Sequence, residues 1–202
     1  VFDPQVYLRR FFAEGIKGDY VFLIDEAHNL VERGREMYSA VLYKEDILKI
    51  KKLVKPYRKK LEKALERCNR QMLEWKRECE TYRILPAVGN FSLALLSVMG
   101  EMENYLEELE DGNLRKELLD FYFEVRSFLY TCDLIDENYV IYTQHDEDGR
   151  FRVKLFCVNP AQNLQNCMDK GRSTIFFSAT LLPVLYYRQL LSGRSDDYAI
   201  YA

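Results

Sequence analysis

The sequence predicts an α+β fold that is predominantly helical: a helical insertion with a small β element, flanked by two pieces of an α/β domain. Two apolar runs of strand length lie near the ends of the chain, at residues 21–24 and 174–177. Between them, apolar residues recur mostly at helical spacing, and one pair of segments alternates like strands. Because neither apolar run is interrupted by polar residues, both favour central strands buried on both faces of an α/β sheet.

Each apolar run stops abruptly at a cluster of polar residues. Asp25, Glu26 and His28 follow the first run, and Ser178 and Thr180 follow the second. In open α/β sheets, ligands bind at the carboxyl ends of the strands. The sequence therefore predicts that both clusters lie where such sheets bind ligands.

Two adjacent carboxylates at a strand end are typical of nucleotide hydrolysis. A nucleoside triphosphate needs a positioned Mg²⁺ and a water aligned with its γ-phosphate. Asp25 is expected to hold the Mg²⁺ through water, and Glu26 to orient the attacking water and accept its proton. The alternative is an acidic helix N-cap after an ordinary core strand, in which Asp25 accepts amides of the first helical turn.

These clusters carry a family resemblance. Residues 25–30 (Asp-Glu-Ala-His-Asn-Leu) resemble motif II of superfamily 2 helicases, and residues 178–180 (Ser-Ala-Thr) resemble motif III. The run at residues 181–193 narrows the resemblance to the XPD/DinG branch of iron–sulfur-type DNA helicases. Residues 1–4 resemble the tail of a segment that precedes motif II in that branch. Leu182 stands where the family usually carries Ser, which removes a hydrogen-bonding side chain at that position.

The resemblance implies a domain plan. Ordinary superfamily 2 helicases place motif III shortly after motif II, whereas the XPD/DinG branch inserts a largely helical Arch domain between them. Residues 1–36 and 161–202 are then parts of the first RecA-like motor domain. Residues 37–160 are the Arch-type insertion, with a β-hairpin.

The resemblance also implies a function for a longer parent protein, an ATP-dependent helicase that moves 5′ to 3′ along single-stranded DNA. Asp25 and Glu26 are then catalytic. His28, Ser178 and Thr180 couple the nucleotide state to DNA contacts and to the second motor domain. ATP and Mg²⁺ are the expected substrate and cofactor.

Parts of such a motor are missing from the sequence. No Gly-rich phosphate loop ending in Lys-Ser or Lys-Thr occurs, and nothing resembles the second motor domain. The chain starts at Val1 without a Met and stops at Ala202, so we expect an excised piece of a larger motor that does not hydrolyse ATP alone. An iron–sulfur cluster in the parent stays open, because the family's cluster ligands would lie upstream of Val1.

Composition predicts a globular, cytoplasmic protein without a membrane partner. The chain is 48% hydrophobic and 30% charged over 202 residues. Its longest apolar stretch, residues 91–99, is too short to span a bilayer. Residues 1–12 contain three charged side chains and no secretory signal. The five scattered cysteines indicate reduced structural thiols, and two distant histidines do not indicate a zinc site.

The dominant element of the insertion is expected over residues 44–83, after a helix at 4–13 and a strand at 39–43. Its apolar residues recur at alternating spacings of four and three, which fits antiparallel or coiled-coil packing. A helix packed on its own domain core predicts nearly the same stripe. Pro56 is expected to start or kink this helix. The stripe comprises Leu61, Leu65, Cys68, Met72, Trp75, Cys79 and Tyr82.

The remaining elements follow from periodicity and turn residues. Helices are expected at 91–109 and 113–130, with Asn113 as the N-cap of the second. A β-hairpin is expected at 139–144 and 151–158, and a polar helix from Pro160 to about Lys170.

Charge is unevenly distributed along the insertion. Residues 44–83 hold 14 Lys and Arg against 7 Asp and Glu, whereas residues 101–150 hold 4 against 15. Four cations opposite the apolar stripe could contact the phosphates of single-stranded DNA in a salt-sensitive way. The alternative is a solvated helix face whose charges pair with Glu66, Glu74 or the acidic helices. The four cations are Lys59, Lys63, Arg70 and Arg77.

Two other readings stay open. In one, residues 44–132 form a helical protein-interaction module that associates through the 61–82 stripe, and the Asp-Glu-Ala-His sequence is incidental. In the other, the helicase fold acts on RNA or carries a DinG-like nuclease activity.

Overall fold

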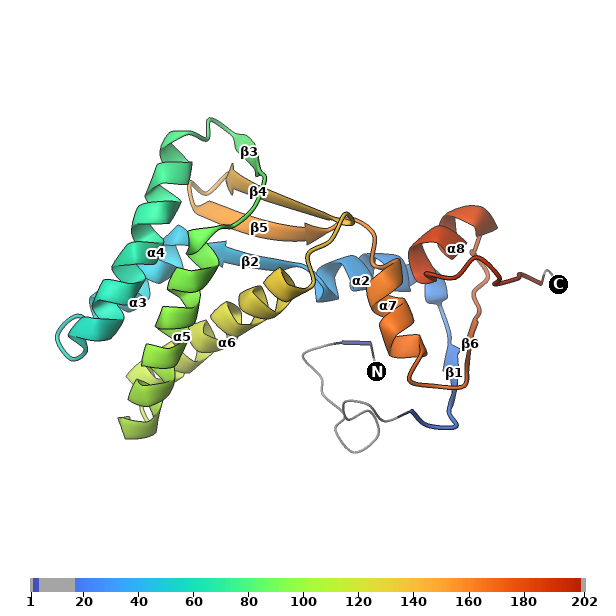
Figure 1. Cartoon of the computed structure of the whole chain (residues 1–202), viewed down its shortest axis with the longest axis horizontal. Helices are drawn as coiled ribbons and strands as arrows, with labels where there is room; N and C mark the ends of the chain where they lie inside the picture. Colours follow the sequence, from blue (N-terminus) through green and yellow to red (C-terminus); the bar gives the residue numbers. More distant parts are fainter. Residues whose placement is uncertain (1, 4–16, 201–202) are drawn as a thin grey trace. The chain divides into compact units, whose positions relative to one another are not determined.

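The computed structural model describes residues 2–3 and 17–200 (Figure 1). It is a mixed α and β structure with about half of its residues in helices. The chain divides into two compact units. We call residues 1–38 with 157–202 the terminal unit and residues 39–156 the inserted unit. The helix expected at residues 4–13 lies outside the described residues.

The terminal unit is built on two parallel strands, β1 (Val21–Ile24) and β6 (Ser173–Phe176). Helices α2 (Leu30–Met37), α7 (Ala161–Met168) and α8 (Val184–Leu191) accompany them. Helix α2 packs closely on the start of α7: a Cβ atom added at Gly34 would lie 3.0 Å from the Cβ of Pro160. Both strands and α7 agree with the sequence-based prediction, whereas α2 and α8 were not predicted.

The expectation that both strands are buried on two faces is wrong for the described chain. Side chains alternate between a covered face and an open one, which leaves Val21 52% and Leu23 68% exposed. On β6, Ile175 is 52% exposed. The reason is that this sheet has two strands among the described residues, and neither helices nor further strands cover its second face.

The inserted unit contains a four-stranded antiparallel sheet in the order β2-β5-β4-β3. Strands β4 and β5 form the expected hairpin, in which the Asp146 amide donates to the Arg150 carbonyl at 2.9 Å. Strand β2 confirms the strand expected at 39–43, and β3 was not expected. The strands are β2 (Ala40–Tyr43), β3 (Tyr82–Leu85), β4 (Tyr139–His145) and β5 (Phe151–Cys157).

Four helices complete this unit. They pack on one face of its sheet, where alternate strand residues and helix residues form one hydrophobic core. Phe91, at the start of α5, is fully buried between the rings of Trp75 and Phe128, at 5.1 and 6.0 Å. The helices are α3 (Lys44–Val54), α4 (Lys59–Arg77), α5 (Asn90–Glu108) and α6 (Asn113–Asp133).

The dominant element expected over residues 44–83 consists of two helices and the start of a strand, and the helices are separated at Pro56, where a start or kink was expected. Helix α3 ends at Val54, Pro56 lies in the connection, and α4 begins at Lys59. Tyr82 belongs to β3 and is 67% exposed, so it is not part of a helical stripe. The break follows from chemistry: proline removes a backbone donor and disfavours helix for the preceding residue.

The helical part of the stripe is buried in the core of the inserted unit. Leu61, Leu65, Cys68 and Met72 are fully buried, and Trp75 is nearly so. The packed-helix interpretation of the spacing is therefore confirmed, and the stripe is not free to form a seam with a partner.

Two further details differ from expectation. Asn113 is the first residue of α6 rather than its cap, and the cap position is Gly112, without a side-chain hydrogen bond. His145 is half-buried rather than solvated, with its ring 5.1 Å from that of Phe151.

Among the described residues, no helix is both long and apolar enough to cross a bilayer.

Candidate functional site

The two polar clusters meet because β1 and β6 are adjacent and parallel. Ile24 and Phe176 are register partners at the ends of the two strands. The amide of Phe177 donates to the Ile24 carbonyl at 3.0 Å, and the amide of Ala27 donates to the Phe177 carbonyl at 3.2 Å. These bonds extend the pairing past both strand ends and hold the two loops side by side.

Glu26, His28 and Ser178 form one polar cluster at this edge. His28 Nδ1 lies 2.8 Å from Ser178 Oγ and 3.2 Å from Glu26 Oε2. Ser178 Oγ lies 3.4 Å from the same carboxylate oxygen and 3.3 Å from Thr180 Oγ1. The structure thus brings four of the five residues expected at this edge into one connected group.

One arrangement of protons satisfies these contacts. The Thr180 amide donates to Ser178 Oγ at 3.2 Å, and an Nδ1–H of His28 donates to the same oxygen. The single Ser178 hydroxyl proton then points to the Glu26 carboxylate. In this arrangement Ser178 is the central residue through which the loop after β1 and the loop after β6 contact each other.

Glu26 has a left-handed backbone, with φ 49° and ψ 42°. Glu26 is the only residue other than glycine with a positive φ among the described residues. For an L-residue this conformation costs roughly 1–2 kcal/mol. Strain of this kind clusters at functional sites, and here it turns the chain from β1 into the short 3₁₀ turn at Ala27–Asn29.

Asp25 does not act as a helix cap. Its Oδ1 accepts the adjacent amide of Glu26 at 2.7 Å, and no side chain caps the following turn. The carboxylate is exposed, and its second oxygen accepts no hydrogen bond from the described residues. The N-cap interpretation is therefore not what the geometry supports.

A magnesium ion is compatible with this donor set. No group of three or more His, Cys, Asp or Glu is arranged to hold a metal within the part of the chain that the structure describes. Mg²⁺, however, keeps several waters and is commonly bound by one or two carboxylates plus substrate phosphates. An exposed Asp25 with one oxygen outward fits that mode.

A cavity of about 1150 Å³ in the terminal unit borders the polar cluster at Ser178. Residues of β6, α8 and the C-terminal segment line it, including Ile175, Leu185 and Ile200. Ser178 is part of its wall, but Asp25 and Glu26 are not. Because its lining includes the open apolar face of β6, this hollow reflects an uncovered sheet rather than a formed nucleotide pocket.

The four cations expected to contact DNA lie on α4, and all four are exposed. Arg70 Nε lies 3.7 Å from Glu66, which also accepts a hydrogen bond from Lys51 at 2.5 Å. Lys59 and Lys63 lie in the first turns of α4, and Arg77 is its last residue. Their spread along the helix makes them a line rather than a cluster.

Sequence reasoning missed several cations and one aromatic residue near Lys59. Lys52 and Lys55 come from the end of α3 and the connection, and Lys60 follows Lys59 on α4. Tyr57, in the connection, is 65% exposed. The signal was present in the composition of residues 51–63, which hold seven Lys and Arg against one Glu.

The comparisons with known proteins do not assign the chain to a family. No protein-family model matches the sequence, and no curated protein matches it. A solved structure titled "Structure of S. tokodaii Xpd4" is similar at 16% identity and a TM-score of 0.45, over 83% of this chain. The chain spans 36% of the length of that structure. A likeness at this level carries no functional argument.

Proposed function

We propose that this chain is part of an ATP-dependent helicase of the XPD/DinG type that moves 5′ to 3′ on single-stranded DNA. The observation that carries the proposal is the contact between His28 and Ser178, at 2.8 Å across adjacent parallel strands. It joins the sequence that resembles motif II to the sequence that resembles motif III. In this proposal the terminal unit is motor-domain structure, and the inserted unit is the Arch-type insertion.

The residues have distinct roles in this mechanism. Asp25 would hold Mg²⁺, and the ion would neutralise charge on the phosphates of ATP. Glu26 orients the attacking water and accepts its proton. Ser178 contacts both Glu26 and His28, so a change at the γ-phosphate that moves Glu26 is transmitted to Ser178 and Thr180.

The open face of the β1/β6 sheet supports the idea of a larger motor. Parallel sheets occur almost always with both faces covered. Here Leu23 and Ile175 lie on an uncovered face, 68% and 52% exposed. Further strands and helices of a parent protein, including the phosphate-binding loop that this sequence lacks, would cover that face. The chain alone is therefore not expected to hydrolyse ATP.

The test is Glu26→Gln in the parent protein. We expect DNA-stimulated ATP hydrolysis to fall by about 10²–10⁴-fold, because the variant keeps the shape but loses the base. Glu32→Gln is the matched control, since Glu32 is an exposed carboxylate of the same unit that pairs with Arg35. Stimulation by DNA and by RNA should be compared in the same assay. Full hydrolysis by Glu26→Gln contradicts the catalytic assignment.

The interaction-module interpretation finds less support. It needs the Leu61–Tyr82 stripe to be available to a partner. The helical part of that stripe is buried inside the inserted unit, and Tyr82 lies on a strand.

A further inference from the structure

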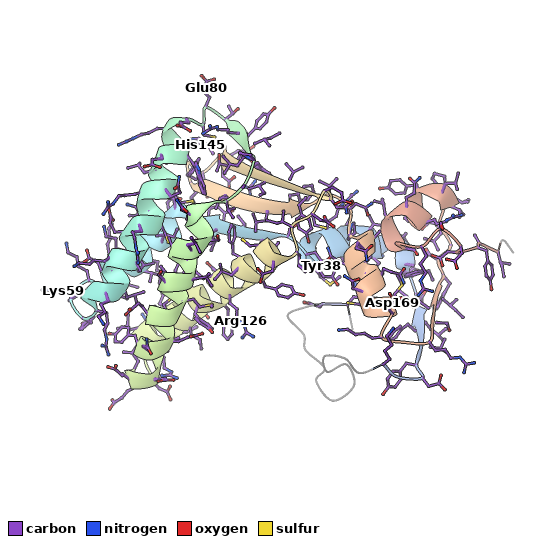
Figure 2. All side chains as sticks on the ribbon, viewed as in Figure 1. Tyr38, Lys59, Glu80, Arg126, His145 and Asp169 are labelled. Atoms are coloured by element: carbon purple, nitrogen blue, oxygen red, sulfur yellow. The ribbon has the colours of Figure 1, made fainter. Side chains whose placement is uncertain are left out.

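The connection between α3 and α4 carries an unusual concentration of cations. Among residues 51–63, seven are Lys or Arg and one is Glu. Five of these lysines are exposed and lie at or near the turn of the α3–α4 hairpin. Figure 2 shows Lys59 at the outer end of α4. We define the lysine tip as Lys52, Lys55, Lys59, Lys60 and Lys63.

The five lysines of the tip are exposed and make no ion pair in the described part of the chain. Within the described residues, no Asp or Glu lies within 4.0 Å of these five ammonium groups. Lys49 and Lys51 nearby do have partners, Glu117 and Glu66. The positive charge of the five tip lysines is therefore not offset by an ion pair within the described residues.

Acidic residues lie near Arg58, which belongs to the same turn. The end of α5 carries Glu107 and Glu108, and the connection to α6 carries Glu110 and Asp111. Arg58, between two lysines of the tip, reaches Glu108 and places its guanidinium 4.8 Å from the Tyr105 ring. A cluster of like charges in one turn opposes folding by self-repulsion. An anionic ligand at the tip would offset this repulsion among the five lysines.

Tyr57 indicates which anion. It follows Pro56 at the apex of the hairpin and is 65% exposed, with Leu53 nearby 36% exposed. An exposed aromatic ring surrounded by cations is typical of proteins that bind single-stranded nucleic acid, with bases on the ring and phosphates on the cations. A membrane surface would instead need a broad apolar helix face, and the apolar faces of α3 and α4 are buried in the core.

The exposed side of α4 extends the tip. Arg67 follows Lys60 and Lys63 at helical spacing, so exposed cations recur close to once per turn. Each turn advances about 5.4 Å along the axis. The tip is thus the densest part of a cationic line that a strand could follow.

We propose that the lysine tip and Tyr57 form a binding site for single-stranded nucleic acid, in which the lysines contact phosphates and Tyr57 stacks on a base. The choice of ligand rests on the proposed function. The site itself lies in the inserted unit and takes no part in ATP hydrolysis, so its test needs no ATP.

The experiment measures binding of the 202-residue chain to a fluorescein-labelled oligothymidylate by fluorescence anisotropy across a salt series. One variant combines Lys52→Gln, Lys55→Gln and Lys60→Gln. Its matched control combines Lys44→Gln, Lys116→Gln and Arg126→Gln, which removes the same charge from cations outside the tip. A second pair compares Tyr57→Ala with Tyr82→Ala, since these two side chains are 65% and 67% exposed.

The expected results differ between the two pairs. The triple tip variant should reduce the slope of log affinity against log salt by about 2, at roughly 0.7 for each lost phosphate contact on a single strand. Its control should leave the slope unchanged. Tyr57→Ala should weaken binding by about tenfold with an unchanged slope, because stacking carries no charge. Tyr82→Ala should bind like the wild type.

Three outcomes overturn the proposal. The first is that the wild-type chain does not bind the oligonucleotide at low salt. The second is that the tip variant and its control lose the same amount of affinity. The third is lysine-dependent binding to phosphatidylserine vesicles without binding to the oligonucleotide. Circular dichroism of each variant checks that the fold is kept. Loss of this site would leave the effect of Glu26→Gln on ATP hydrolysis untouched, so the two proposals fail separately.

Discussion

His28 Nδ1 lies 2.8 Å from Ser178 Oγ, although 150 residues separate the two side chains in the sequence. The inserted unit makes up most of the sequence between His28 and Ser178. The adjacent strands β1 and β6 bring these two residues back together. A chemical group at the end of one strand is thereby linked to a group at the end of the next. The following predictions test this link and the structure around it.

Ser178→Ala should separate hydrolysis from strand movement in the parent protein. The substitution removes the hydroxyl that contacts His28, Glu26 and Thr180, but it leaves both carboxylates in place. We expect DNA-stimulated ATP hydrolysis to be largely kept while strand separation is lost, measured on the same preparation. Ser173→Ala, an exposed serine at the start of β6, is the control and should keep both activities. Normal strand separation by Ser178→Ala would refute the coupling role.

The left-handed backbone of Glu26 should discriminate between two replacements that both remove the carboxylate. Asn tolerates φ 49° and ψ 42°, whereas a β-branched Val does not. We expect Glu26→Val to be locally less stable than Glu26→Asn by about 1–2 kcal/mol. Hydrogen exchange of the Ala27 amide, which donates to Phe177 at 3.2 Å, reports this difference. Equal exchange in the two variants would show that the strain is not present in solution.

Phe91→Ala should strongly destabilise the inserted unit. The ring is fully buried against Trp75 and Phe128. Its removal leaves a cavity and should cost about 3–5 kcal/mol of unfolding free energy. Because Trp75 is the single tryptophan and lies in the same core, its fluorescence in a urea titration reports this unit. Phe123→Ala is the control: Phe123 is 52% exposed, and its loss should cost no more than about 0.5 kcal/mol.

The contact between Lys51 and Glu66 should make the stability of the α3–α4 hairpin depend on pH. The hydrogen bond from Lys51 holds the pKa of Glu66 below its ordinary value, against the opposing effect of desolvation. A lowered pKa in the folded state means that the ionised carboxylate stabilises the fold above the unfolded-state pKa. This contribution is lost as the pH falls through the lowered pKa.

Glu66→Gln should therefore lower the unfolding free energy at neutral pH, by less than about 1 kcal/mol because the pair is partly exposed. The difference from wild type should vanish on acidification and shrink with added salt. Urea titrations at several pH values, followed by Trp75 fluorescence, measure it. Glu80→Gln is the control, since Glu80 is exposed and has no ion pair among those found in the described structure. A difference that persists in acid would contradict the assigned cause.

The sequence by itself determined the elements whose signals are local. Apolar runs predict β1 and β6, alternation predicts the β4–β5 hairpin, and helical spacing predicts which side of α4 is buried. The polar residues that follow the two runs indicated where a site would lie. These features need only neighbours within a few residues, because strand and helix periodicity is set by backbone geometry.

The tertiary structure alone decided features that depend on distant partners. Nothing local shows that His28 meets Ser178, because the contact exists only once β1 and β6 pair in parallel. The same is true of charge: Arg70 is neutralised and the lysine tip is not, although both belong to one basic stretch of sequence. The open face of β1 and β6 has the same origin. An apolar strand specifies that it should be buried, but only other elements of the fold can bury it.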